Sequence, residues 1–314
     1  MSISLRSLRY LVALDEHRHF GRAAEALGIT QPALTRSLQG LEEELGVRLM
    51  ERHQRGGVEP TAFGQLLLER GQKLLLDSDE LVREVALLRG LELGELTVSA
   101  GLYPAELSVA PAVGKLIQQH PKLRCHLKIE GWRQATDDVL NRRSDFAVAE
   151  SSVADPHSEL SATLIGEHAM VFFCRTRHPL LKRTTIHIED VVEYPWVATR
   201  GPKRMVQFLP KDLKRSGHLD AEQGDFLPAV VVDDLSSTRR VVAASDGIGA
   251  APLALIQEDV RRNKFAIVPC HPKWLRLHYG VIALKHRMLS PAAKALIDII
   301  VQIEKQLTTT AKSP

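Results

Sequence analysis

The residues between positions 30 and 36 carry side chains that suit the major groove of DNA. Gln31 can form two hydrogen bonds with adenine, and Thr35 can contact the methyl group of thymine. Arg36 can pair with guanine or with a phosphate. Such contacts require a rigid element that presents all three side chains together, so the prediction depends on the secondary structure around them.

The pattern of apolar residues predicts two short helices joined by a tight turn. Apolar residues recur at helical intervals over residues 20–27, and Gly28 can end this helix because a left-handed conformation costs glycine little. Thr30 can cap the next helix, and Pro32 fits its first turn, where a missing amide does no harm. Residues 20–39 therefore read as a helix-turn-helix. A generic helical bundle with the same spacing is the alternative.

A small wing is expected to follow these helices. Residues 47–49 alternate like a short strand, residues 55–57 form a turn, and residues 58–61 return as a second strand. Arg52 and Arg55 would place cations where DNA phosphates lie. Single arginines are usually just solvated, so the wing supports the helix-turn-helix but does not establish it.

A proline-free stretch from residue 62 to about residue 89 predicts one long helix. Its leucines form a seam with a seven-residue spacing, at Leu67, Leu74, Leu81 and Leu88. A connector helix has little else to bury its leucines against, so we expect the seam to pair with a second copy of the chain. Packing of the seam on the chain's own domains is the alternative.

Beyond residue 91, strands alternate with helices, which predicts α/β sheets. The expected strands cover residues 95–100, 123–129, 145–149, 169–174, 196–198, 229–232, 265–268 and 277–284. Helices are expected between many of them, for example at residues 108–119, 136–142 and 236–244. Ligand clefts in such sheets open at the carboxyl ends of the strands.

Composition limits the class of protein. The chain has 314 residues, of which 44% are hydrophobic and 25% charged, so it is long enough for about two domains. The net charge is +3, but residues 1–90 hold 12 basic and 13 acidic residues, which gives this segment a charge of −1. Any recognition of DNA must therefore depend on local geometry and not on net charge. Three widely spaced cysteines fit a reducing compartment, and no apolar run is long enough for a membrane helix. We expect a soluble, cytoplasmic protein.

Residues 20–36, FGRAAEALGITQPALTR, closely resemble the N-terminal domain of LysR-type transcriptional regulators. The resemblance continues to Arg52 and includes the PTAFG sequence at residues 60–64. It then extends over nearly the whole chain through short motifs in the family's order, at residues 120–121, 143–148, 178–180 and 247–252. The motifs in the first sixty residues are highly specific, whereas the later ones are individually loose.

The resemblance implies a mixed α/β protein with three parts. These are a winged helix-turn-helix over residues 1–61, a dimerising linker helix over residues 62–90 and a periplasmic-binding-protein-like effector domain over residues 91–314. The effector domain would have two lobes, about 91–166 with 269–314 and about 167–268. The resemblance also implies a homodimer or homotetramer bound to an interrupted dyad in promoter DNA, a small-molecule effector between the lobes, and RNA polymerase as a further partner.

Site residues follow from the resemblance position by position. Those expected to contact bases and nearby backbone are Thr30, Gln31, Pro32, Ala33, Thr35 and Arg36, with Arg52 and Arg55 near phosphates. The family often uses a serine or threonine after the first effector-domain strand to hold a carboxylate. This chain departs from that pattern, with Tyr103 and Pro104 there, which argues against the usual small carboxylate effector. The Tyr103 hydroxyl and the helix N-terminus would have to attract the anion instead.

Four further residues at strand ends are expected to line the same cleft: Trp132, Thr199, Arg200 and Asp233. For each of them, ordinary packing or exposure is the alternative. Arg200 lies near Lys203 and Arg204, which suggests an anionic ligand, although an exposed basic loop explains these residues equally well.

Other classes of protein fit less well. No nucleophile elbow, zinc motif or phosphate loop is present, and Gly247-x-Gly249 lacks a third glycine and is interpreted as a strand-to-helix turn. A freestanding solute-binding protein would leave the first ninety residues unexplained. Peroxide-sensing relatives use two nearby cysteines in the second lobe, where only Cys174 is expected here. We therefore expect no catalysis, no cofactor, no metal and no thiol switch.

Overall fold

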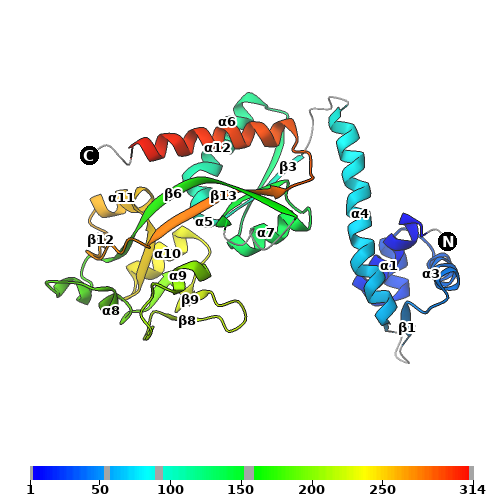
Figure 1. The fold of residues 1–314 in the computed structure, drawn as a ribbon, viewed down its shortest axis with the longest axis horizontal. Coiled ribbons are helices and arrows are strands. Elements are labelled where there is room, and N and C mark those ends of the chain that lie inside the picture. Colours follow the sequence, from blue (N-terminus) through cyan, green and yellow to red (C-terminus); the bar gives the residue numbers. More distant parts are fainter. Residues whose placement is uncertain (1–2, 53–56, 89–94, 152–158, 311–314) are drawn as a thin grey trace. The chain divides into compact units, whose positions relative to one another are not determined.

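The computed structural model describes residues 3–52, 57–88, 95–151 and 159–310 (Figure 1). The chain divides into two compact units, Met1–Leu91 and Glu92–Pro314. Among the described residues, no helix combines the length and the apolar character needed to cross a membrane.

The first unit consists of three helices, a hairpin and a long helix. The elements are α1 (Leu5–His17), α2 (Phe20–Ala26), α3 (Gln31–Leu45), β1 (Met50–Arg52), β2 (Val58–Pro60) and α4 (Ala62–Leu88). Their apolar faces form one core that includes Leu14, Ala23 and Leu34. Helix α1 packs closely on α4 at Gly71, where an added Cβ would lie 2.9 Å from Leu8 Cδ2.

The first wing strand begins three residues later than predicted. The Glu42 carboxylate accepts hydrogen bonds from the amides of Leu49 and Met50, at 2.7 and 3.2 Å. This interaction with α3 holds residues 47–49 outside the ladder, so antiparallel pairing begins with Met50 opposite Pro60.

The second unit is built on a nine-stranded sheet whose main order is β10-β7-β11-β6-β13-β5-β3-β4, with β12 paired to β6. The strands are β3 (Glu95–Ala100), β4 (Arg124–Ile129), β5 (Phe146–Ala149), β6 (Leu160–Arg175), β7 (Trp196–Ala198), β10 (Val230–Val231), β11 (Ile248–Pro252), β12 (Phe265–Ile267) and β13 (Arg276–Leu284). A separate hairpin joins β8 (Gly217–Leu219) to β9 (Phe226–Pro228). The longer helices are α6 (Ala110–Gln119), α7 (Trp132–Leu140), α10 (Leu235–Ala243), α11 (Leu253–Arg261) and α12 (Pro291–Thr310).

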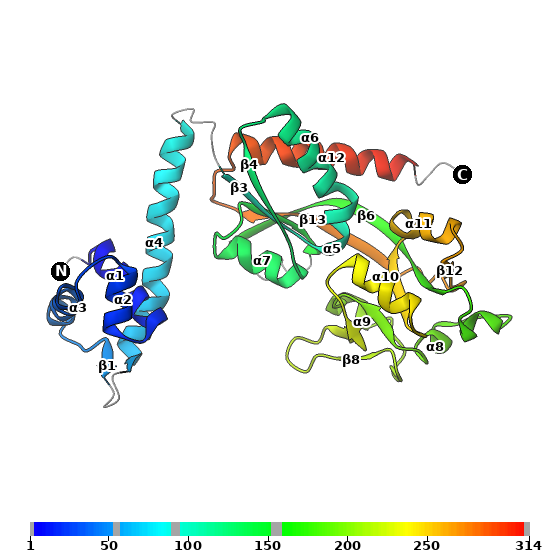
Figure 2. The ribbon, with the colours of Figure 1, turned by 180° about the vertical axis from the view of Figure 1, so that it is seen from behind.

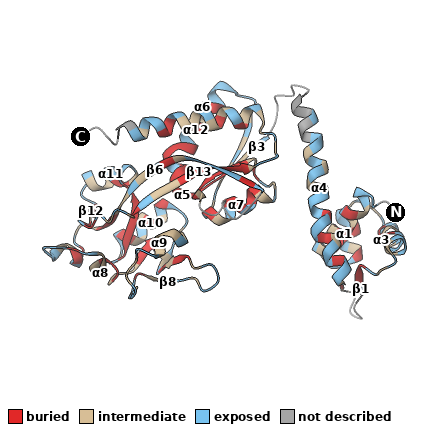
Figure 3. Ribbon diagram, in the orientation of Figure 1, coloured by how far each residue is buried: buried red, intermediate tan, exposed pale blue. Residues whose placement is uncertain are grey.

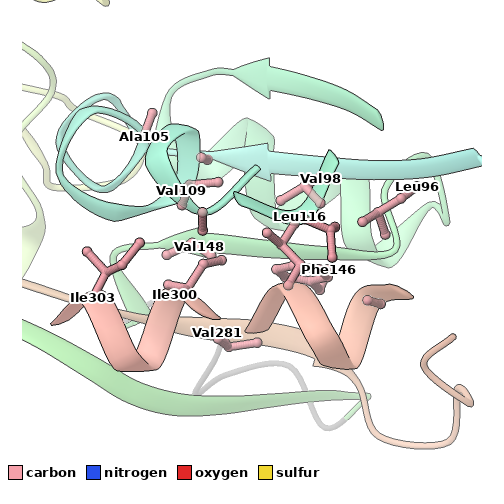
Figure 4. Close-up of a cluster of buried hydrophobic side chains, with 14 of the residues drawn as sticks. Leu96, Val98, Ala105, Val109, Leu116, Phe146, Val148, Val281, Ile300 and Ile303 are labelled. Carbon is pink, nitrogen blue, oxygen red and sulfur yellow. The ribbon is translucent and has the colours of Figure 1, made fainter. Parts of the chain in front are cut away.

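In the first lobe, helices cover both faces of the sheet. Strand β5 shows the alternation: Phe146 and Val148 pack with α6 and α12, while Ala147 and Ala149 pack with α7. Helix α12 lies beside α6 along the sheet (Figures 1 and 2). Figure 4 shows Ile300 and Ile303 of α12 reaching the same core as Val109 and Phe146.

The second lobe has the same layered plan. On one face, α10 and α11 contribute Val242 and Ile256 to a core with Phe173. On the other face, Phe172 and Trp196 pack with the short helix α8 (Ile188–Val191) and with β9. Strands β6 and β13 run antiparallel and link the two lobes, because β6 also pairs with β11 and β12 in the second lobe.

Two sequence predictions about the strands of this unit were wrong. Strand β6 begins at Leu160 rather than near residue 169. Its residues 161–164 are all exposed and show no alternation, but they pair with β13. The expected strand-to-helix turn at Gly247-x-Gly249 is instead the start of strand β11, which begins directly after Gly247, and an added Cβ at Gly249 would lie 2.4 Å from Phe173 Cζ. That glycine makes room for an aromatic ring and not for a phosphate.

Candidate functional site

Helices α2 and α3 and the turn between them form a helix-turn-helix. Gly28 has a φ of 65°, in the left-handed region that favours glycine. The Ile29 amide donates to the Ala24 carbonyl, and the Thr30 hydroxyl caps α3 by accepting from the Ala33 amide at 3.4 Å. The His19 side chain caps α2 through the Gly21 amide, a cap that was not anticipated from the sequence.

The start of α3 presents an exposed polar face. Of the residues expected to contact DNA, those that are exposed are Thr30, Gln31, Pro32, Ala33 and Arg36, while Thr35 is half-buried. On the opposite face of α3, Leu34, Leu38 and Leu41 are buried in the unit's core. Arg52 ends strand β1, whereas its side chain and the whole of Arg55 lie outside what the structure describes.

The leucine seam of α4 is exposed over the part that leaves the core of its unit (Figure 3). Leu67 is half-buried against that core. Leu74 and Leu81 are 52% and 63% exposed, and Val85, on the same face, is 50% exposed. The Leu88 side chain lies outside the described part of the helix.

The second unit contains a cleft of about 690 Å³ between its lobes. It is lined by all six residues expected to contact an effector: Tyr103, Pro104, Trp132, Thr199, Arg200 and Asp233. Tyr103 and Trp132 also join the lobes. The Tyr103 hydroxyl donates to the Ala250 carbonyl at 2.7 Å, and the Trp132 indole donates to the Arg200 carbonyl at 3.2 Å. Burial raises the pKa of the Tyr103 hydroxyl, so it remains a hydrogen-bond donor.

Asp225 is a fully buried carboxylate at which both lobes meet. It accepts from Arg133 Nε of α7 at 2.7 Å, and from the Lys203 amide of the second lobe at 3.1 Å. Arg200 Nη1 lies 3.4 Å from the same carboxylate and 2.5 Å from Asp220 Oδ2. The hydrogen bond from Arg200 lowers the pKa of Asp220. Arg200 is therefore an anchored cation rather than part of an exposed basic loop.

Several cleft residues were not anticipated from the sequence. Charged ones are Glu130, Arg133, Asp137, Glu150 and Arg276, while Arg204, noted in the sequence beside Arg200, also lines the cleft. Glu150 directly follows the predicted strand 145–149, so its strand-end position was a usable signal. Apolar wall residues such as Met170, Trp196 and Phe226 read as ordinary core in the sequence because nothing local distinguishes a cleft wall from a core.

The second lobe holds two cysteines, which corrects the expectation of one. Cys174 and Cys270 are both buried in the same apolar cluster. Burial raises the pKa of Cys174 to about 12 and also raises that of Cys270. Both thiols are therefore held in the protonated form, which is the less reactive one. In the described part of the chain, no cluster of three or more histidine, cysteine or acidic side chains could hold a metal ion.

Comparison with known proteins agrees with this architecture. A family model described as "LysR substrate binding domain" matches residues 89–303, and one described as "Bacterial regulatory helix-turn-helix protein, lysR family" matches residues 5–65. A relative from a Pseudomonas species, named "SDS degradation transcriptional activation protein", is 37% identical over 94% of this chain and 95% of its own length. The regulator GbpR of Azospirillum brasilense is 31% identical over 94% of this chain and 85% of its own length.

Solved structures share the whole fold. A full-length OxyR variant from Pseudomonas aeruginosa has a TM-score of 0.61 and 18% identity, covering 96% of this chain and 95% of its own. Full-length CbnR in complex with its target DNA has a TM-score of 0.59 and 18% identity, covering 96% and 100%. The chain belongs to the LysR family, whose members are DNA-binding transcriptional regulators with an effector-binding domain. The Pseudomonas and Azospirillum relatives are both named for transcriptional control and not for catalysis.

Proposed function

We propose that this chain regulates transcription by placing two copies of α3 in successive major grooves of an interrupted promoter dyad. The supporting observation is the capped, exposed start of α3 above a buried apolar face. Contacts to bases and nearby backbone come from Thr30, Gln31, Pro32, Ala33, Thr35 and Arg36, while Arg52 and Arg55 lie near phosphates. Residues 1–61 act as the DNA-binding domain, in the cytoplasm with the chromosome.

The exposed seam of α4 pairs the subunits. Leu74 and Leu81 offer an apolar strip that a second copy would cover, and Leu67 and Leu88 belong to the same seven-residue repeat of the sequence. Residues 62–90 form this linker helix, and residues 91–314 form the effector domain. Two such dimers assemble into a homotetramer. Two weak half-sites then act as one specific site.

The inter-lobe cleft holds the small-molecule effector, an anion, against Tyr103, Pro104, Trp132, Thr199, Arg200 and Asp233. Binding there shifts the population of lobe arrangements and, through the linker, the spacing of the DNA-binding pairs. The 37% identical relative is named for activating SDS degradation, which supports an anionic organic effector class. RNA polymerase is the partner on which promoter-bound protein acts.

Replacing Arg36 with alanine tests the base-reading role. We expect Arg36→Ala to weaken binding to the specific operator by about 1–3 kcal/mol, because a bidentate contact to guanine is lost. Binding to random DNA should change little. Fluorescence anisotropy with both DNAs measures the ratio, and Arg262→Ala, which removes an exposed arginine just after α11, is the matched control. An equal loss on both DNAs would show a phosphate contact and remove Arg36 from base reading.

A further inference from the structure

Arg204 differs from the other arginines of the cleft because it forms an ion pair across the cleft. Arg204, on the short helix α9 (Lys203–Val206), holds Glu150 from the end of β5 with two hydrogen bonds. The distances are 3.2 Å from Nε to Oε1 and 2.7 Å from Nη2 to Oε2. The Glu150 side chain is 7% exposed and that of Arg204 is 31% exposed. This two-point geometry is the one by which a guanidinium binds a carboxylate, sulfate or phosphate.

The other arginines of the cleft have partners behind its wall. Arg133 is held by the buried Asp225, Arg200 by Asp220 and Asp225, and Arg276 pairs with Glu167 at 2.6 Å on the adjacent strand β6. Neither Asp225 nor Glu167 lines the cleft, whereas Glu150 does. A ligand entering the cleft can therefore meet Arg204 and its carboxylate partner together.

The rest of the cleft suits an apolar body. Large apolar side chains from both lobes line it, including Trp132, Met170, Trp196, Met205, Phe226 and Leu277. Its four lining arginines face four lining carboxylates, Glu130, Asp137, Glu150 and Asp233, and three of the arginines also pair with carboxylates behind the wall, so the cleft has no excess positive charge to attract a multiply charged anion. A volume of about 690 Å³ lies within the range of pockets for organic ligands.

We propose, on the basis of the effector role assigned above, that the cleft takes an amphipathic anion. The ligand has an apolar body and one sulfate ester, sulfonate or carboxylate headgroup, and Glu150 is an internal competitor for that headgroup at Arg204. Displacing Glu150 from Arg204 costs free energy, because the Glu150 carboxylate is only 7% exposed and the Arg204 guanidinium keeps only its 3.3 Å hydrogen bond to the Arg276 carbonyl. An anionic headgroup restores the hydrogen bonds of the guanidinium and so recovers part of this cost, whereas a neutral compound with the same body does not. The ion pair thus selects for charge on the ligand.

Titration of the full-length protein with matched eight-carbon compounds tests this proposal. Trp132 and Trp196 line the cleft, so tryptophan fluorescence reports binding, and calorimetry confirms the affinity. The probes are octyl sulfate, octanesulfonate, octanoate, octan-1-ol and inorganic sulfate, all below micelle-forming concentrations. We expect at least one of the three amphipathic anions to bind more tightly than octan-1-ol and inorganic sulfate by on the order of tenfold or more. A ten-carbon homologue should bind more tightly by about fourfold per methylene, which corresponds to ~0.8 kcal/mol each.

Two substitutions separate the headgroup site from general binding. Glu150→Gln keeps the side-chain shape but removes the competing charge, so it should tighten octyl sulfate binding by about tenfold and leave octan-1-ol unchanged. Arg204→Gln should abolish the preference for the charged probes, and Arg204→Lys should restore part of it. Glu258→Gln and Arg262→Gln alter an exposed ion pair at the end of α11 and serve as matched controls. Thermal melting verifies that each variant is folded.

Either of two results would overturn the proposal. One is equal affinity of the wild type for octyl sulfate and octan-1-ol. The other is a folded Glu150→Gln protein that binds the anionic probes more weakly than the wild type does, or equally well. Operator binding, measured in parallel, tests the effector role separately. If octyl sulfate binds in the cleft as predicted but leaves operator binding unchanged, the headgroup assignment stands and the effector role of the cleft fails. If operator binding responds to octyl sulfate in wild type and in Arg204→Gln alike, the effector role stands and the headgroup assignment fails.

Discussion

Replacing Leu81 with aspartate is expected to separate the proposed α4 dimer and to lower operator affinity by about 10²–10⁴-fold. Leu81 is 63% exposed within the isolated chain, and Leu74, two helical turns away on the same face, is 52% exposed. In a dimer both would be covered, and a buried unpaired carboxylate at either position is strongly unfavourable. Loss of the dimer leaves each half-site bound independently, which removes the gain from two linked contacts.

The control for this variant lies on the opposite face of the same helix. Gln72 is exposed and is displaced by about half a turn of the helix from Leu74, so Gln72→Asp introduces the same charge away from the seam. Light scattering should show a reduced mass for Leu81→Asp and an unchanged mass for Gln72→Asp. A Leu81→Asp protein that keeps the wild-type mass and operator affinity would remove the seam from the interface.

Removing the carboxylate of Asp225 is expected to destabilise the effector domain by about 3–5 kcal/mol. Asp225→Ala leaves Arg133 without its carboxylate partner and the Lys203 amide without an acceptor, and it leaves Arg200 paired with Asp220 alone. The Arg133 bond crosses between the lobes, so its loss also weakens the contact that holds them together. For a domain of this size the thermal midpoint should fall by roughly 6–20 °C.

Differential scanning calorimetry of the full chain measures this effect. The transition of residues 92–314 is assigned by comparison with Leu81→Asp, a substitution that lies outside those residues. Glu258→Ala, which removes an exposed carboxylate on α11, should leave the midpoint essentially unchanged. Asp225→Asn keeps the shape and should lie between wild type and Asp225→Ala. An unchanged midpoint in Asp225→Ala would show that the hydrogen bonds at Asp225 contribute little to stability.

The helix-turn-helix could be read from the sequence because local rules determine it. A left-handed glycine at Gly28, a threonine cap at Thr30 and helical spacing of apolar residues act within a few positions of one another. The same holds for the strand at Glu95–Ala100, whose bounds match the prediction, and for β7 at Trp196–Ala198. The fold class also followed from the family resemblance, which the family models confirm.

The electrostatics of the cleft could not be predicted in this way. Glu150 and Arg204 are 54 residues apart, and Arg133 and Asp225 are 92 apart, so no local pattern joins them. Strand ends indicated which segments face the cleft, but the pairing of charges depends on how the two lobes meet. The full length of β6 was missed for a related reason, since its exposed residues 161–164 are stabilised by pairing with β13 and not by burial.

Sequencing of the genomic DNA fragments retained by the purified protein tests the central claim most directly. Heparin is included to remove weak electrostatic binders. We expect the wild type to retain a few promoter fragments that share an interrupted dyad, and Arg36→Ala to lose this enrichment. The proposed function would be contradicted if the retained fragments shared no dyad, both without and with a cell metabolite extract that supplies the effector.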